Sequence, residues 1–238
     1  MDLFGIIIAK LTINLNKKMR RLITLVIVLI STLCVVNAQD EMKVSEQMAR
    51  DILSQMSNTV KSYKAFRMTF SMTNENKRTG SKEKTTGVLI VKGDKYVIDL
   101  PDFVTYNDTK TVSVWQRKNN EVDISDADPD AEGDLSPSKL FCAYQSGYKL
   151  RLLGDRKIGS KTCTEIDLYP TDKKTNIIRI RLSVDASTNA IQRIFQQMKS
   201  GDSTTIDIEK FETNVSLSDN DFVFDVVSHK DVEVVDLR

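Results

Sequence analysis

The chain has 238 residues, of which 40% are hydrophobic and 28% are charged, a composition typical of a globular protein. Its 34 basic and 33 acidic residues nearly cancel, but five of the basic residues and one acidic residue lie within residues 1–38. The rest of the chain therefore has 29 basic and 32 acidic residues. This balance gives no basic surface, so we do not expect nucleic acid as a partner.

The first 38 residues have the order of a secretory signal, in which a positive cluster is followed by an apolar run and then by small residues. The apolar run, Leu22–Val36, has 15 residues, fewer than the 20 or so of a typical bilayer-spanning helix. We predict cleavage after Ala38 and export of residues 39–238 from the cytoplasm, with an uncleaved anchor as the alternative. The positive cluster consists of Lys17, Lys18, Arg20 and Arg21.

Most of residues 1–18 lies before the positive cluster and is superfluous to a secretory signal. Met19, followed by two arginines, is a more natural start, so we interpret residues 1–18 as a mis-assigned upstream start.

An amphipathic helix is predicted at residues 45–62, where apolar side chains recur every four residues. From Phe66 the period changes to two, which is typical of a half-buried strand. The helical stripe consists of Val44, Met48, Ile52, Met56 and Val60, and the first strand alternates through Phe66, Met68, Phe70 and Met72.

Further strand-like runs follow, separated by turn residues. An acidic run at 126–134 reads either as a solvated loop or as an imperfect calcium loop, and Ser136-Pro137 then predicts a short helix at about 137–145. The runs are 84–91, 95–100, 103–107, 111–117, 121–125, 148–153, 161–169, 176–185, 190–199 and 203–213, with Phe222-Val223-Phe224 near the end.

This order predicts one domain that is mainly β with a few helices: a long antiparallel sheet and two or three helices. A twisted sheet of about ten strands tends to curl or close, and the chain has too few helices to cover both faces of a flat sheet. A half-open barrel would enclose a cavity on its concave face. That cavity is either filled by the protein's own side chains or holds an apolar ligand.

The sequence favours binding over catalysis. His229 is the single histidine, and we interpret it as an exposed tail residue rather than as part of a triad or metal site. Two cysteines remain after cleavage, Cys142 and Cys163. A disulfide between them is possible in an oxidising compartment, and two buried thiols are the alternative.

Several segments, in their order and spacing over residues 41–238, resemble the LolA family of periplasmic lipoprotein carriers, and most closely its Bacteroidetes-type branch. They are Lys64-Ala65-Phe66-Arg67-Met68-Thr69-Phe70 after a helix, Gly87-Val88-Leu89-Ile90-Val91-Lys92, Asp108-Thr109-Lys110-Thr111-Val112, Ser136-Pro137 through Tyr144, and Ser218-Asp219 with Phe222-Val223-Phe224 before Val232–Asp236.

The resemblance implies an unclosed antiparallel β-barrel with a helical lid over an apolar cavity. It also implies a monomeric chaperone of outer-membrane biogenesis that uses no cofactor. Such carriers bind the acyl chains of lipoproteins, receive them from an inner-membrane lipoprotein-releasing ABC transporter, and pass them to an outer-membrane acceptor. A regulatory domain that senses a lipid or a lipoprotein with the same half-barrel is the alternative.

On this reading the cavity and lid residues would contact the acyl chains. Two departures from the family pattern are Gly93, where several members have arginine, and Thr109, where the family has a turn glycine. The expected contacts are Met48, Ile52, Met56, Phe66, Met68, Phe70, Met72, Tyr96, Ile98 and Leu100 in the cavity, and Leu140, Phe141 and Tyr144 in the lid.

Overall fold

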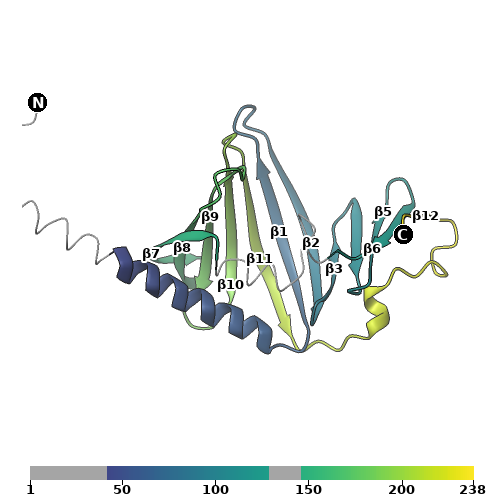
Figure 1. Ribbon diagram of the computed structural model, residues 1–238, viewed down its shortest axis with the longest axis horizontal. Helices are drawn as coiled ribbons and strands as arrows, with labels where there is room; N and C mark the ends of the chain where they lie inside the picture. The colour runs from purple at the N-terminus through teal and green to yellow at the C-terminus, as the bar shows by residue number, and fades with distance from the viewer. Residues whose placement is uncertain (1–41, 129–145) are drawn as a thin grey trace, which may run out of the picture. The chain divides into compact units, whose positions relative to one another are not determined.

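The computed structural model describes residues 42–128 and 146–238. Residues 46–238 form one compact unit built on a twelve-stranded sheet. The strands lie side by side in the order β12-β6-β5-β4-β3-β2-β1-β11-β10-β9-β8-β7 (Figure 1). Neighbouring strands are antiparallel except for β12 and β6, which are parallel. Within the described residues β7 and β12 end the sheet without pairing to each other, so it is not closed.

The predicted fold class is confirmed, and each of the eleven long predicted runs is a strand. The strands are β1 Phe66–Glu75, β2 Lys82–Lys92, β3 Lys95–Asp99, β4 Phe103–Asn107, β5 Thr111–Gln116, β6 Glu121–Asp126, β7 Tyr148–Ile158, β8 Lys161–Pro170, β9 Ile177–Asp185, β10 Ile191–Met198, β11 Ser203–Thr213 and β12 Glu233–Asp236.

β7 is longer than its predicted run of 148–153. Gly154 has a φ of 95°, and the register between β7 and β8 shifts between Leu152 and Gly154. A bulge at this glycine lets the strand continue, and Asp155–Ile158 pair with the start of β8.

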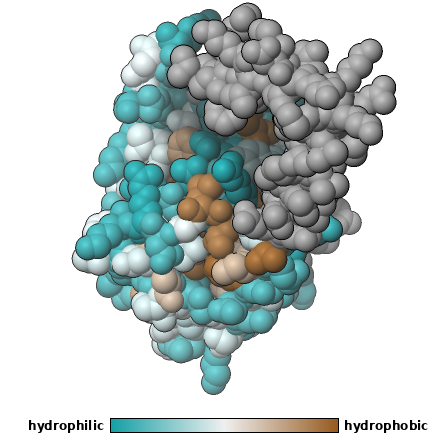
Figure 2. Space-filling model, turned by 90° about the vertical axis from the view of Figure 1, so that its left-hand side faces the viewer, coloured by the Kyte–Doolittle hydropathy of each residue, from teal (hydrophilic) through white to brown (hydrophobic). Residues whose placement is uncertain are grey.

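One helix, residues 42–62, packs on one face of the sheet, which we call the helix face. Its buried apolar residues are Ala49, Leu53, Met56 and Val60, spaced on average close to 3.6 residues apart. They belong to one apolar cluster with residues of β1, β2, β3, β7, β8, β9 and β10, among which Ile166, Leu168 and Leu182 are fully buried. At the β7 end of the sheet, Figure 2 shows apolar side chains within a largely hydrophilic surface.

The opposite face of the sheet carries a second apolar cluster. Tyr96 and Ile98 of β3 belong to the helix-face core, whereas Val97 between them packs with Val104 and Phe222. Successive residues of a strand point to opposite faces, so these two clusters lie on the two sides of the sheet.

The chain after β11 covers this second cluster. The predicted strand at Phe222–Phe224 is wrong: Asp219–Phe222 form a 3₁₀ helix, named η2. A capping box between Ser218 and Asp221 supports this turn, and Asp219 bridges Lys92 and Lys95 at 2.9 and 3.2 Å. These local polar contacts select the turn over an extended strand.

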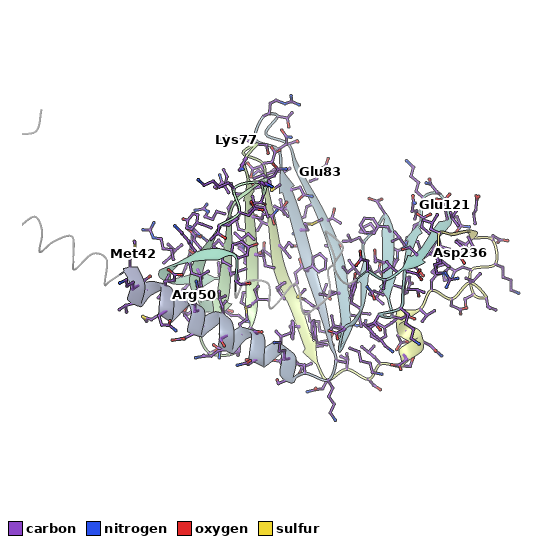
Figure 3. All side chains as sticks on the ribbon, in the orientation of Figure 1. Met42, Arg50, Lys77, Glu83, Glu121 and Asp236 are labelled. Atoms are coloured by element: carbon purple, nitrogen blue, oxygen red, sulfur yellow. The ribbon has the colours of Figure 1, made fainter. Side chains whose placement is uncertain are left out.

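His229 is not an exposed tail residue. It is half-buried, and its ring lies 4.7 Å from that of Trp115 and 4.8 Å from that of Phe224. The chain then returns to the sheet as β12, which pairs with β6. In Figure 3 the labelled Glu121 and Asp236 lie together at this end of the sheet, and Lys77 and Glu83 lie at the β1–β2 hairpin.

The predicted helix at 137–145, with Leu140, Phe141 and Tyr144, lies outside the described residues. Most of the acidic run at 126–134 lies outside them too.

Candidate functional site

The helix face holds an apolar pocket with a volume of about 250 Å³. Strands β1, β2, β3, β10 and β11 supply its walls. Among the described residues, no polar side chain and no side chain of the helix lines the pocket. The lining residues are Met68, Phe70, Met72, Leu89, Ile98, Leu100, Ile191, Ile194, Ile206 and Ile208.

The strand period builds the pocket. β1 contributes three alternate residues, Met68, Phe70 and Met72, and its partner β11 places Ile208 opposite Phe70 and Ile206 opposite Met72. Alternate residues of paired strands share one face, so β1 and β11 together present an unbroken apolar surface.

The two sides of the pocket differ in stiffness. The β10–β11 side is made of isoleucines, whose branched Cβ restricts the first side-chain torsion. The β1 side contains Met68 and Met72, and methionine has several rotatable bonds that let it fit varied shapes. The pocket therefore has one wall of fixed form and one that can adapt to what it contacts.

Five of the residues expected from the sequence line this pocket: Met68, Phe70, Met72, Ile98 and Leu100. The structure brings them together from β1, β3 and the residue that follows β3. Whether they contact a ligand stays a prediction.

The other expected residues lie elsewhere. Met56, Phe66 and Tyr96 are buried in the core at 0%, 1% and 4% exposure, and Ile52 packs against that core. Met48 is 50% exposed on the helix. The three predicted lid residues, Leu140, Phe141 and Tyr144, lie outside the described residues.

Sequence reasoning missed half of the lining: Leu89, Ile191, Ile194, Ile206 and Ile208. Ile206 and Ile208 alternate within a predicted strand, so the signal for their face was present. What the period does not give is the pairing partner of that strand, and the pairing with β1 puts them in the pocket.

Charged side chains gather on the opposite face of β8–β11. Asp167 is 1% exposed and accepts hydrogen bonds from Arg181 Nε at 2.7 Å and Nη2 at 3.0 Å. Arg179 and Tyr169 lie near the same carboxylate. Burial alone would raise the pKa of Asp167, but the bonds and charges of the two arginines hold it below its usual value.

Cys163 is fully buried on the same face as Asp167. Burial raises its pKa, and the charge of Asp185 adds to this shift. Cys142 lies outside the described residues, so a disulfide between the two cysteines stays a prediction.

Residues 42–128 and 146–238 contain no group of three or more histidine, cysteine or acidic side chains placed to hold a metal ion. No helix in those two ranges is both long enough and apolar enough to span a membrane.

No protein-family model matches the chain, and neither does any curated protein sequence. Among solved structures, an uncharacterised conserved protein from Thermus thermophilus is similar with a TM-score of 0.55 and 12% identity, over 79% of this chain and 99% of that one. A LolA superfamily protein from Nitrosomonas europaea matches with a TM-score of 0.41 and 12% identity, over 74% and 97%. The lipoprotein LppX from Mycobacterium tuberculosis matches with a TM-score of 0.45 and 14% identity, over 73% and 100%.

The class that the topology and the pocket define is an open half-barrel with a helix across one face. This is the class that the sequence resemblance implied. The Bacteroidetes-type branch stays a prediction.

Proposed function

We propose that this chain is an exported carrier that binds the acyl chains of lipoproteins in the helix-face pocket. The observation that carries the proposal is the pocket lining: ten apolar side chains, with no group that could act as an acid, a base or a nucleophile. Such a lining suits a ligand recognised by its hydrocarbon alone, because apolar burial is non-directional and needs no polar partner.

The energetics explain why a carrier is needed. Burial of hydrocarbon is worth about 0.8 kcal/mol per methylene, so three acyl chains with about 45 methylenes would cost about 36 kcal/mol to expose to water. Unassisted transfer across an aqueous compartment would be negligibly slow. A carrier has to offer apolar surface comparable to a membrane and then release the chains.

The size of the pocket indicates how the chains enter. At about 250 Å³ it is larger than the roughly 150 Å³ engineered cavity that binds benzene. That volume takes the end of one acyl chain. Binding of further chains requires the apolar surface around it to open, and the adaptable β1 wall is where such a change is easiest.

The rest of the proposal follows from the sequence. The charged, apolar and small-residue order of residues 1–38 supports export to the periplasm with cleavage after Ala38. The resemblance to LolA carriers supports an inner-membrane ABC transporter as donor and an outer-membrane acceptor as the destination.

Release of a lipoprotein from inner-membrane vesicles by the purified protein tests the carrier function. Ile206→Glu should abolish release, since it puts a carboxylate into the apolar pocket. Thr205→Glu is the matched control, because Thr205 is the neighbouring residue of β11 and points to the opposite face. Equal release by Ile206→Glu and the wild type would exclude this pocket as the binding site.

The same assay separates the carrier from the sensing alternative. A protein that co-purifies with lipid but releases no lipoprotein, and instead binds a membrane regulator tightly, would have a regulatory role with the same half-barrel.

A further inference from the structure

Gly87 of β2 lies beneath two side chains of the pocket. It pairs with Phe70 of β1, and a Cβ built on Gly87 would lie 2.6 Å from Phe70 Cζ and 2.7 Å from Leu100 Cδ2. Both atoms are the far ends of pocket-lining side chains. The backbone oxygen of Asp99 would also be close, at 3.1 Å.

The backbone does not require glycine at this position. Several glycines of this chain have positive φ, for example Gly93 and Gly154, but Gly87 has not. Glycine inside a strand is less stabilising than alanine, because it loses more conformational freedom on folding. Its role at residue 87 is therefore to provide space, since any other residue would have a Cβ in contact with Phe70 and Leu100.

We propose that Gly87 sets the depth of the pocket and thereby the length of hydrocarbon that it accepts. The Phe70 ring and the Leu100 side chain occupy the space above Gly87, which leaves the region between them and the isoleucine wall open. An added carbon pushes these two side chains toward that wall. The isoleucines are stiff, so the volume is lost from the pocket. This inference rests on the proposed function, since it assigns a selectivity to the same site.

The test is a series of binding measurements with octanoate, dodecanoate and hexadecanoate on the purified protein. Gly87→Ala should weaken hexadecanoate binding about tenfold, the loss expected when one or two methylenes stay in water, and should change octanoate binding far less. Thr86→Val is the control, because Thr86 is the exposed neighbour on the opposite face of β2.

A second substitution tests whether Gly87→Ala acts by removing space from the pocket. Phe70→Leu shortens the side chain above residue 87, so Gly87→Ala/Phe70→Leu should recover hexadecanoate binding toward the wild-type value. Should Gly87→Ala alone not fold, this double variant decides the matter. Wild-type binding of all three acids by folded Gly87→Ala, or a double variant that folds but does not recover hexadecanoate binding, would overturn the inference. If the wild type binds none of the three acids, the proposed function itself is overturned.

Discussion

At the scale of single residues, Thr109 has a backbone conformation that a β-branched residue adopts at a cost. Its φ is 78°, in the left-handed region that favours glycine. The turn around it is held by side-chain acceptors: Asn107 Oδ1 accepts from the backbone of Thr109 at 2.7 Å, and Asp108 Oδ1 accepts from that of Thr111 at 2.7 Å. The sequence already marked this position, where the LolA pattern has glycine.

Thr109→Gly should raise the free energy of unfolding by about 1 kcal/mol, because it removes the Cβ clash of the left-handed conformation and only part of that gain is lost to chain entropy. Thr109→Ala is the control: it keeps Cβ and should gain much less. Urea unfolding of the three proteins measures the difference. Equal stability of the Gly and Ala variants would show that the conformation is not strained.

At the scale of elements, the long helix shows where sequence reasoning fell short. A spacing of four residues advances about 400° around a helix, about 40° beyond one full turn at each step. The predicted stripe therefore drifts from the buried Val60 and Met56 to the exposed Met48 and Val44. Ala49 and Leu53, which are fully buried, take their place on the sheet side.

Because of this drift, we expect alanine substitutions at two methionines of the same stripe to lower stability by very different amounts. Met56→Ala should cost roughly 2 to 5 kcal/mol of stability, because it leaves a cavity between helix and sheet. Met48→Ala should change stability by less than about 0.5 kcal/mol, since its side chain is half exposed. Thermal or urea unfolding gives both values, and a comparable loss at the two positions would contradict the helix orientation.

The charged side chains on the opposite face of β8–β11, which include Asp167, predict that the free energy of unfolding depends on pH. The pKa of Asp167 is lower in the folded protein than its unfolded value of about 3.9, so its stabilising contribution is present above that pH and is lost as the pH falls through the folded pKa. Asp167→Asn should therefore be less stable than the wild type at neutral pH, and the gap should narrow on acidification. A gap that stays constant from neutral to acidic pH would show that the Asp167 charge contributes nothing.

At the scale of the whole molecule, local periodicity was enough for the strands but not for the site. Strand-like runs separated by turn residues predicted β1 to β11, because both signals lie within a few consecutive residues. The pocket depends on long-range register, such as Phe70 opposite Ile208, and on which part of the helix face the helix leaves uncovered. Neither is encoded in any single segment.

The two faces of the sheet have different coverings. The helix packs on one face, and the segment with η2 and His229 packs against residues of β3–β5 on the other. The pocket lies on the helix face, over the central strands β3, β2, β1, β11 and β10. We therefore expect binding on the helix face and a structural role for the opposite face.

The most direct measurement is photo-cross-linking with a fatty acid that has a diazirine at the end of its alkyl chain, followed by mapping of the labelled residues by mass spectrometry. We expect labels on the pocket strands, at Met68, Met72, Ile206 or their pocket neighbours, and loss of these labels when hexadecanoate competes. Labels confined to the C-terminal segment or to the charged face, with none in the pocket, would contradict this expectation.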